Sequence, residues 1–388
     1  MRWGVVRERR PGERRVALAP DAVRAATEAG DAVVVEAGAG DAAGYPDRQY
    51  VEAGAQIGSA ADALGADVVV KVRAPFAASG LDEREHLRPG AALVALLAPL
   101  ADPAAAADLA RRGVTAFSLD QVPRITRAQS MDVLSAMSTV TGYRAVLEGA
   151  TLTRRFFPML MTATGTVTPA RVLILGAGVA GLQAIATSRR LGAVVQAFDA
   201  RPAARDQVES LGASFVGLPP LAQSGEGEGG YARQMAADEE ARERELLAEP
   251  VAKADLVITT ALVPGARAPL LIDEAMVAAM RPGSVIVDLA AEAGGNCAVT
   301  RAGETVAHAG VLVHGPTDLA SAMPGQASFL FSRALAAFVR NLTAAGLALP
   351  TPQPPPALPD DPIVRGACIT YGGEVVHEAT RKRLEGAQ

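Results

Sequence analysis

A glycine-rich turn and one aspartate have the residue types and spacing that bind a dinucleotide. Gly176, Gly178 and Gly181 form a GxGxxG pattern that follows an apolar run and opens an alanine-rich segment. In that setting the first glycine permits a tight turn, the second lets the backbone approach a pyrophosphate, and the third lets a helix pack against its strand. Asp199 ends the next apolar run, about twenty residues further on. A carboxylate there accepts hydrogen bonds from ribose hydroxyls and repels a 2′-phosphate, so the pattern predicts NAD rather than NADP.

Arg201 lies two residues beyond this aspartate and works against that preference. An arginine near the ribose can accommodate a 2′-phosphate, which would favour NADP. A glycine turn also occurs in α/β proteins that bind no ligand. The strand before the turn, the helix after it and the acid at this distance together favour a nucleotide site.

A second polar segment precedes a long helical pattern. Gln129, Asp132 and Ser135 are spaced three apart, which places them along one face of a helix. Together with Arg124 they offer donors and acceptors for a nicotinamide carboxamide and its ribose. The same residues are equally typical of a capped helix entry with surface charge, so the residues alone leave both interpretations open.

Composition restricts the class of protein. A chain of 388 residues is long enough for two or three domains of roughly 150 residues each. The net charge of −5, spread along the chain, argues against nucleic acid or an anionic membrane surface as the main partner. The longest apolar stretch, residues 91–101, is about half the length of a bilayer span, and the N-terminus is charged where a signal peptide is apolar. We expect no membrane crossing, although the chain could dock onto a protein that crosses one.

The residues typical of metal sites and covalent nucleophiles do not form their usual patterns. Cys297 and Cys368 are the two cysteines, without a CxxC pair, and are expected to be reduced thiols. The sequence has no HExxH, Cys/His cluster or GxSxG, so it predicts neither a metal nor a nucleophile. Structural or surface roles are expected for the histidines, which are His86, His308, His314 and His377.

Alternating apolar runs and helical patterns predict an α/β protein with two sheets. Parallel strands connected through helices build a sheet that helices cover on both faces, so we expect two Rossmann-like, doubly wound parallel sheets joined by long helices. One such helix is predicted at residues 131–155 and another at 327–345. The predicted strands cover residues 5–6, 32–36, 68–72, 93–97 and 115–118 in the first sheet, and 172–175, 194–198, 256–259, 285–288 and 311–313 in the second.

These runs also predict the domain boundaries. We expect residues 1–130 with 346–388 to form an N-terminal domain, and residues 131–345 to form the NAD(H)-binding domain. The C-terminal tail completes the first domain with a predicted strand pair at residues 363–376. The glycine-rich residues 224–231 are predicted to be a loop.

The polar segment before the long helix resembles a known family. RITRAQSMDVLS at residues 124–135, with GYRAV at 142–146, is similar to the NAD(H)-binding alpha subunits of proton-translocating NAD(P) transhydrogenases, in the alanine dehydrogenase/transhydrogenase family. The resemblance spans essentially the whole chain, although Ala136 and Met137 stand where that family often has Ser-Gln. Further similar segments are GERRVALAP (12–20), VVVKVRAP (68–75), GAGVAGLQAIATSRRLGA (176–193), VITTALVPG (257–265), VIVDLAAEAGGNC (285–297) and IVRGACIT with GEVVHE (363–378).

The resemblance implies roles for residues of both polar regions. The nicotinamide end of NAD(H) would be held by Arg124, Ile125, Thr126, Arg127, Gln129, Asp132 and Ser135. The pyrophosphate and adenosine end would be held by Gly176, Gly178, Val179, Gly181, Asp199, Ala200 and Arg201, with Gly230 and Leu262 completing the site. Tyr231 would lie on a loop that closes over the nucleotide and, with Arg124, Gln129, Asp132 and Ser135, would serve the hydride transfer.

The resemblance also implies an activity and partners. Members of this family transfer a hydride directly between NAD(H) on this subunit and NADP(H) on a partner subunit, and a membrane component couples the transfer to proton translocation. Members of this length are separate subunits that form homodimers. They are peripheral on the cytoplasmic face of the membrane complex.

Two alternatives remain open at this level. The related alanine dehydrogenases need a general acid to reduce an imine, and their substrate-binding arginine and lysine could be matched by Arg15 and Lys71, with Glu292 as an acid. Their histidine is missing here, because the corresponding strand reads Ala-Leu-Leu at residues 95–97. Transfer between two nicotinamides needs only proximity and exclusion of water, which favours a transhydrogenase and leaves Arg15 and Lys71 with structural or surface-pair roles. The second alternative is a non-catalytic NAD-binding module.

Overall fold

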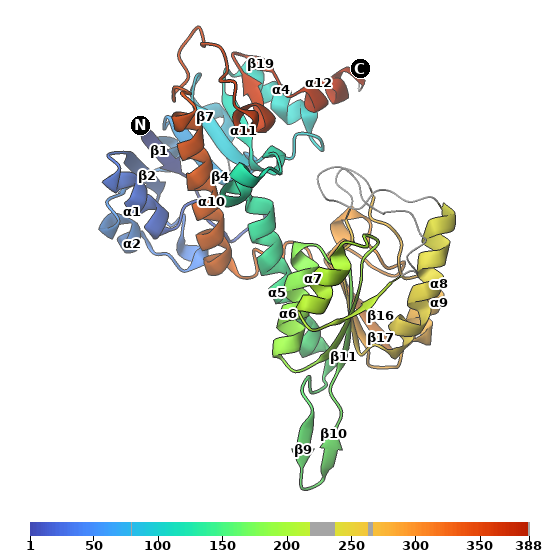
Figure 1. Ribbon diagram of the computed structural model, residues 1–388. Helices are drawn as coiled ribbons and strands as arrows, with labels where there is room; N and C mark the ends of the chain where they lie inside the picture. Colours follow the sequence, from blue (N-terminus) through green and yellow to red (C-terminus); the bar gives the residue numbers. More distant parts are fainter. Residues whose placement is uncertain (79, 218–236, 263–266, 387–388) are drawn as a thin grey trace. The chain divides into compact units, whose positions relative to one another are not determined.

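The structure is a computed structural model that describes residues 1–78, 80–217, 237–262 and 267–386. The chain divides into two compact units (Figure 1). Unit 1 comprises Met1–Met137 and Ala320–Gln388, and unit 2 comprises Ser138–Leu319. Among the helices of the described segments, none combines the length and apolar character that a bilayer span needs.

Unit 1 contains an eight-stranded sheet in the order β3-β2-β1-β4-β7-β8-β18-β19. The strands from β3 to β8 are parallel. β18 and β19, from the C-terminal region of the chain, pair antiparallel, and β19 forms the edge of the sheet. The order reverses between β1 and β4, which makes this position the topological switch point of the sheet. The strands are β1 Arg2–Val5, β2 Ala32–Glu36, β3 Gln56–Gly58, β4 Val68–Arg73, β7 Ala92–Leu96, β8 Thr115–Ser118, β18 Cys368–Tyr371 and β19 Glu374–Val375.

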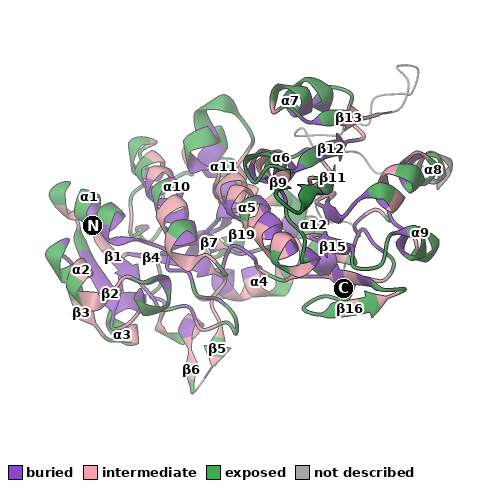
Figure 2. Ribbon diagram, turned by 90° about the horizontal axis from the view of Figure 1, so that it is seen from below, coloured by how far each residue is buried: buried purple, intermediate pink, exposed green. Residues whose placement is uncertain are grey.

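Valine-rich strands place this sheet in the interior of unit 1 (Figure 2). β4 has the sequence VVVKVR and is buried along its first five residues, as in a parallel strand covered on both faces. On one face, α3 Ala60–Leu64 and α4 Pro103–Arg111 contribute Leu64 and Leu109 to the core.

Unit 2 contains a seven-stranded sheet in the order β13-β12-β11-β14-β15-β17-β16. All pairs are parallel except that of the edge strand β16 with β17. The switch point lies between β11 and β14. The strands are β11 Arg171–Leu175, β12 Val194–Phe198, β13 Ser214–Val216, β14 Leu256–Thr259, β15 Val285–Asp288, β16 Thr305–His308 and β17 Val311–His314.

Side chains of β11 alternate between two cores, because successive residues of a strand point to opposite faces. Val172 and Ile174 join one core, and Leu173 and Leu175 join the other. The first core includes residues of α5, α6 and α7, and the second includes residues of α8 and α9. These helices are α5 Val133–Thr153, α6 Val179–Arg190, α7 Ala204–Ser210, α8 Ala237–Lys253 and α9 Glu274–Ala279. The predicted α/β class is thus confirmed, with antiparallel strands at the edges of both sheets.

A short hairpin that the sequence did not predict extends away from the sheet of unit 2 (Figure 1). It consists of β9 Leu160–Thr162 and β10 Gly165–Val167, paired antiparallel. Met159 and Met161 on this segment are 59% and 79% exposed. Their apolar side chains therefore face solvent in the isolated chain.

The predicted strand pair at residues 363–376 is wrong over its first residues. Residues up to Ala367 form the helix α11 Pro362–Ala367 instead. The Asp361 carboxylate accepts hydrogen bonds from the backbone N–H groups of Ile363 and Val364, at 2.8 and 3.0 Å. With Pro362 at the first helical position, these bonds favour a helix over a strand.

The helix α10 Pro324–Ala344 lies in unit 1, whereas the sequence placed residues 320–345 in the nucleotide-binding domain. It packs against α1 Pro20–Glu28 and the 3-10 helix η4 Thr126–Met131. Its apolar face completes the core of unit 1. Helical periodicity predicted this element but could not indicate which sheet it covers.

Candidate nucleotide-binding site

The turn between β11 and α6 needs two of its three glycines for its own geometry. Gly176 has φ +99°, and a Cβ added there would lie 2.5 Å from the Thr260 hydroxyl oxygen. A Cβ at Gly181 would lie 1.8 Å from the carbonyl oxygen of Gly176. A larger residue at Gly181 would have to move the backbone, and one at Gly176 would have to displace the Thr260 side chain and adopt a strained, positive φ. The strand, turn and helix predicted from GxGxxG are therefore confirmed.

The third glycine, Gly178, has open space in front of it. A Cβ added there would meet no atom within 4 Å, and its φ of −73° is accessible to any residue. Internal packing therefore does not explain a glycine here. The open space fits a backbone that a bulky ligand approaches, which is the role the fingerprint assigns to this position.

Gly178 is the N-cap residue of α6, and no side chain caps this N-terminus. The first N–H groups of a helix lack intrahelical acceptors and carry the positive end of the helix dipole. They lie at the carboxyl end of β11, beside the switch point, where open α/β sheets bind ligands. Phosphate oxygens suit these donors.

Asp199 reaches back to this turn from the end of β12. It is 8% exposed, and its Oδ2 accepts a hydrogen bond of 2.7 Å from the backbone N–H of Ala177. Its Oδ1 accepts the backbone N–H of Arg201 at 2.9 Å. The Arg201 guanidinium also binds both carboxylate oxygens, at 2.8 and 2.9 Å. The structure therefore brings Asp199, Arg201 and the glycine turn together.

The loop after β14 forms the other side of the switch point, and sequence reasoning missed the residues that hold it. The Thr260 hydroxyl donates to the carbonyl of Gly176 at 3.0 Å. The Asn296 side chain accepts from the N–H of Ala261 at 3.1 Å and donates to the same residue's carbonyl at 2.9 Å. Leu262, the next residue, is 44% exposed at this edge. The signal was available, because Thr260 directly follows a predicted strand.

Asp288, at the end of β15, orders the segment that carries Asn296. It is fully buried and accepts hydrogen bonds from the hydroxyls of Thr259 and Thr300, at 2.8 and 2.6 Å. It also accepts the backbone N–H groups of Asn296 and Cys297, at 2.8 and 3.1 Å. A buried carboxylate needs such donors to offset its loss of hydration.

The second predicted polar constellation lies in unit 1. Ser135 donates both its backbone N–H and its hydroxyl to the Asp132 carboxylate, at 2.8 and 2.6 Å, so Asp132 caps α5. Arg127 is ion-paired with Asp361 at 2.6 Å. The structure groups these residues along η4 and the first turn of α5, and four further members are exposed: Arg124, Ile125, Thr126 and Gln129. Of the other predicted residues, Val179 is the first residue of α6 and is 40% exposed, and Ala200 lies between Asp199 and Arg201. Gly230 and Tyr231 lie outside the described residues.

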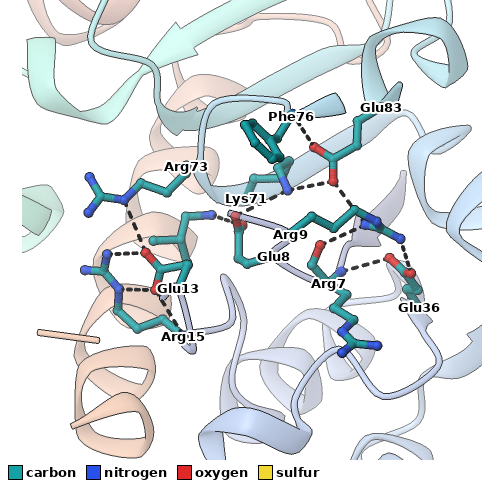
Figure 3. A network of polar contacts seen from close by, with 11 residues as sticks. Arg7, Glu8, Arg9, Glu13, Arg15, Glu36, Lys71, Arg73, Phe76 and Glu83 are labelled. Atoms are coloured by element: carbon teal, nitrogen blue, oxygen red, sulfur yellow. Dashed lines mark hydrogen bonds and ion pairs between the residues drawn. The ribbon is translucent and has the colours of Figure 1, made fainter. Parts of the chain in front are cut away.

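Lys71 is held inside unit 1 by two carboxylates (Figure 3). It is fully buried, and its Nζ lies 3.1 Å from Glu83 and 3.3 Å from Glu8. Burial raises the pKa of the Glu8 carboxyl, and the charge of Lys71 opposes that shift. Arg9 connects Glu36, at the end of β2, with Glu83, the first residue of the 3-10 helix η2 Glu83–His86.

Arg15 belongs to the same network of charges (Figure 3). Its guanidinium binds both oxygens of Glu13, at 2.7 and 2.5 Å, and Arg73 reaches Glu13 at 3.2 Å. Burial acts to raise the pKa of Glu13, but the hydrogen bonds and charges of these arginines lower it to about 2. Arg15 and Lys71 are thus both paired with internal carboxylates. Glu292, the acid considered with them, is exposed on the 3-10 helix η6 Ala291–Ala293 of unit 2.

Both cysteines are buried free thiols. Burial raises the pKa of Cys297 to about 11 and that of Cys368 to about 12, so neither is a thiolate at neutral pH. Within the described ranges, no group of three or more His, Cys, Asp or Glu side chains could hold a metal ion. His314 is bonded between Thr305 and Glu148, at 2.7 and 3.1 Å.

Comparison with known proteins covers both units. The family models for the N-terminal and C-terminal domains of alanine dehydrogenase/PNT match residues 4–141 and 145–378. An NAD(P) transhydrogenase alpha subunit of Rhodospirillum rubrum is 46% identical over 98% of each chain. A transhydrogenase structure from Sinorhizobium meliloti has 41% identity and a TM-score of 0.83, covering 98% of this chain and 100% of that one. An L-alanine dehydrogenase structure has 30% identity and a TM-score of 0.81, covering 100% of both chains.

Proposed function

Because this chain belongs to the alanine dehydrogenase/PNT family and is similar over its full length to transhydrogenase alpha subunits, we propose that it binds NAD(H) in unit 2 for hydride exchange with NADP(H) held by a partner subunit. The pyrophosphate would lie on the N-terminus of α6, and the adenosine ribose would bind Asp199. The open space at Gly178 is the observation that carries this proposal. It distinguishes a ligand-binding turn from one shaped only by packing.

Residues of η4 and α5 would bind the nicotinamide end. Arg124, Gln129, Asp132 and Ser135 offer polar groups there, and Gln129 is an exposed residue. Bound nicotinamide supplies a hydride donor or acceptor at C4. Neither ring gains or loses a proton when a hydride passes between two nicotinamides. The chain therefore has to orient the ring and exclude water, rather than supply an acid or a base.

Isotopic labelling of the transferred hydride tests this proposal. With the purified chain and an NADP(H)-binding partner, deuteride at C4 of NADH is expected to appear in NADPH. Loss of the label to solvent would contradict direct transfer. Asp199→Asn should weaken NADH binding in calorimetry, and Arg301→Ala, which removes an exposed charge from the same unit, should not.

An alanine dehydrogenase is the second candidate, because an L-alanine dehydrogenase shares the fold and 30% of the sequence. It is disfavoured because β7 carries no histidine as a proton donor. Arg15 and Lys71 would also have to leave buried carboxylates to bind a substrate acid. NADH oxidation by this chain alone that depends on pyruvate and ammonia would restore this candidate.

We further propose that the chain forms a homodimer and lies on the cytoplasmic face of a membrane through its partner subunits. The exposed apolar side chains at the hairpin β9–β10 support a contact with a second copy, since such patches commonly mark interfaces. Sedimentation at micromolar concentration is expected to show a dimer. Met161→Ser should shift it toward monomer.

A further inference from the structure

The Asp199 carboxylate has no acceptor position left for a ribose. A carboxylate offers about four hydrogen-bonding positions on its two oxygens. Four bonds already fill them. Oδ2 accepts from Ala177 N and from the Arg201 side chain, and Oδ1 accepts from Arg201 N and from the same side chain.

The proposed function requires Asp199 to accept two ribose hydroxyls, so two of the existing bonds must break. The backbone N–H groups of Ala177 and Arg201 belong to the turns at the ends of β11 and β12 and cannot leave without unfolding those turns. The guanidinium is on a rotatable side chain that is 21% exposed, and it supplies the other two bonds. Only this side chain can be exchanged.

We propose that the Arg201 guanidinium is an internal competitor for the adenosine ribose, which must displace it from Asp199 when the nucleotide binds. This inference rests on the proposed NAD(H) site. It makes Arg201 a residue that determines specificity. The Arg201 side chain weakens the binding of a nucleotide whose ribose has a free diol. It also screens the charge of Asp199 from a nucleotide with a 2′-phosphate, because a guanidinium pairs well with phosphate.

The proposal is tested with adenosine fragments that isolate this end of the site. Calorimetry would measure ADP, 2′,3′-dideoxy-ADP and 2′-phospho-ADP on the full chain and on Arg201→Ala. Removing the competitor should tighten ADP binding about five-fold, as expected for a partly buried ion pair that no longer has to be broken. The dideoxy nucleotide cannot donate to Asp199, so its affinity should not increase. 2′-Phospho-ADP should bind more weakly to Arg201→Ala, because the negative charge of Asp199 is then no longer screened from the 2′-phosphate.

The dideoxy nucleotide separates exchange from general electrostatics. If removing a positive charge merely altered the potential at the phosphates, ADP and its dideoxy analogue would change together, and the proposal would be overturned. An unchanged or weaker ADP affinity would also overturn it. Arg301→Ala also removes one positive charge, and it should leave the affinities for all three nucleotides unchanged. A thermal melt checks that each variant is folded.

Asp199→Asn distinguishes failure of this inference from failure of the function itself. If that variant loses ADP affinity while Arg201→Ala gains none, the nucleotide site stands and the competitor does not exist. If neither variant alters ADP binding, the nucleotide does not bind at Asp199, and both proposals fail. Arg201→Lys keeps the charge without the two-pronged contact, so it should bind ADP with an affinity between those of the full chain and Arg201→Ala.

Discussion

The carboxyl ends of β1 and β11 can be compared directly, because each is the first strand of a doubly wound sheet and each lies beside the switch point of its unit. After β11 the chain continues as Gly176-Ala177-Gly178 into a helix whose N-terminus no side chain covers. After β1 it continues as Val-Arg-Glu-Arg at residues 6–9, and buried charged side chains fill the corresponding edge. The same topology thus supports an open backbone donor site in one unit and a closed ion-pair network in the other. The difference lies in the few residues after the strand, which is why a fold does not by itself imply a function.

Disrupting the ion-pair network at the carboxyl end of β1 should have the largest effect on stability. Lys71→Met leaves Glu8 and Glu83 buried without their shared ammonium, and such a loss costs about 3–5 kcal/mol. Urea unfolding followed by Trp3 fluorescence would measure it, because Trp3 is the only tryptophan and lies buried in unit 1. Adding Glu8→Gln should recover some of the loss. A cost below about 1 kcal/mol would mean that the network contributes no stability beyond that of surface pairs.

The same edge should respond to acid. The folded pKa of Glu13, about 2, lies below its usual value of 4.5. Glu13 therefore stabilises the folded state above pH 4.5, and this contribution, on the order of 3 kcal/mol, is lost as the pH falls toward 2. The stability difference between the natural chain and Glu13→Gln should shrink over that range.

Glu8 provides a control of opposite sign for the acid response. Because the pKa of Glu8 is raised in the folded state, its contribution to folding stability is present at low pH and is lost as the pH rises through the folded pKa. The difference between the natural chain and Glu8→Gln should therefore shrink as the pH rises. A difference for Glu13→Gln that does not vary with pH would contradict the role assigned to the Arg15 contact.

Adding a side chain in the open space at Gly178 should reduce the affinity for NADH and leave stability almost unchanged. Gly178→Ala places a methyl group in space that is empty of protein atoms, where we propose the pyrophosphate. NADH affinity should fall at least about ten-fold, or about 1.4 kcal/mol, while unfolding changes by less than about 1 kcal/mol.

Gly181→Ala is the contrast to this variant. It should destabilise unit 2 by about 1–3 kcal/mol through its clash with the carbonyl of Gly176. Unchanged NADH affinity in a folded Gly178→Ala variant would remove the main support for the nucleotide site.

These two edges also show what could be predicted from the sequence. The glycine turn was predictable because strand, turn and helix are adjacent along the chain, and because Gly176 and Gly181 have local steric reasons. The pairing of Lys71 with Glu83 was not, because those residues are brought together by a bulge-containing strand and a 3-10 helix that periodicity does not reveal. Local capping chemistry could have revealed α11, since Asp361 and Pro362 are a helix-start signal that the apolar residues after them obscured. The pairing of Arg201 with Asp199 could not be predicted either, because the spacing alone is compatible with a ribose or an arginine as the partner of Asp199.

The smallest expected change in stability decides whether unit 1 serves the nucleotide at all. Asp132→Asn keeps a good cap for α5, so unfolding should change by less than about 0.5 kcal/mol, whereas Asp132→Ala should cost about 1 kcal/mol. If Asp132 also binds the nicotinamide ribose, both variants should slow hydride transfer to NADP⁺ by a similar factor despite their different stabilities. Transfer that is impaired only in Asp132→Ala, in proportion to its lost stability, would identify a helix cap and nothing more. In that case the polar face of η4 and α5 would resemble the closed edge of β1, as a structural device, and ligand binding would belong to unit 2 alone.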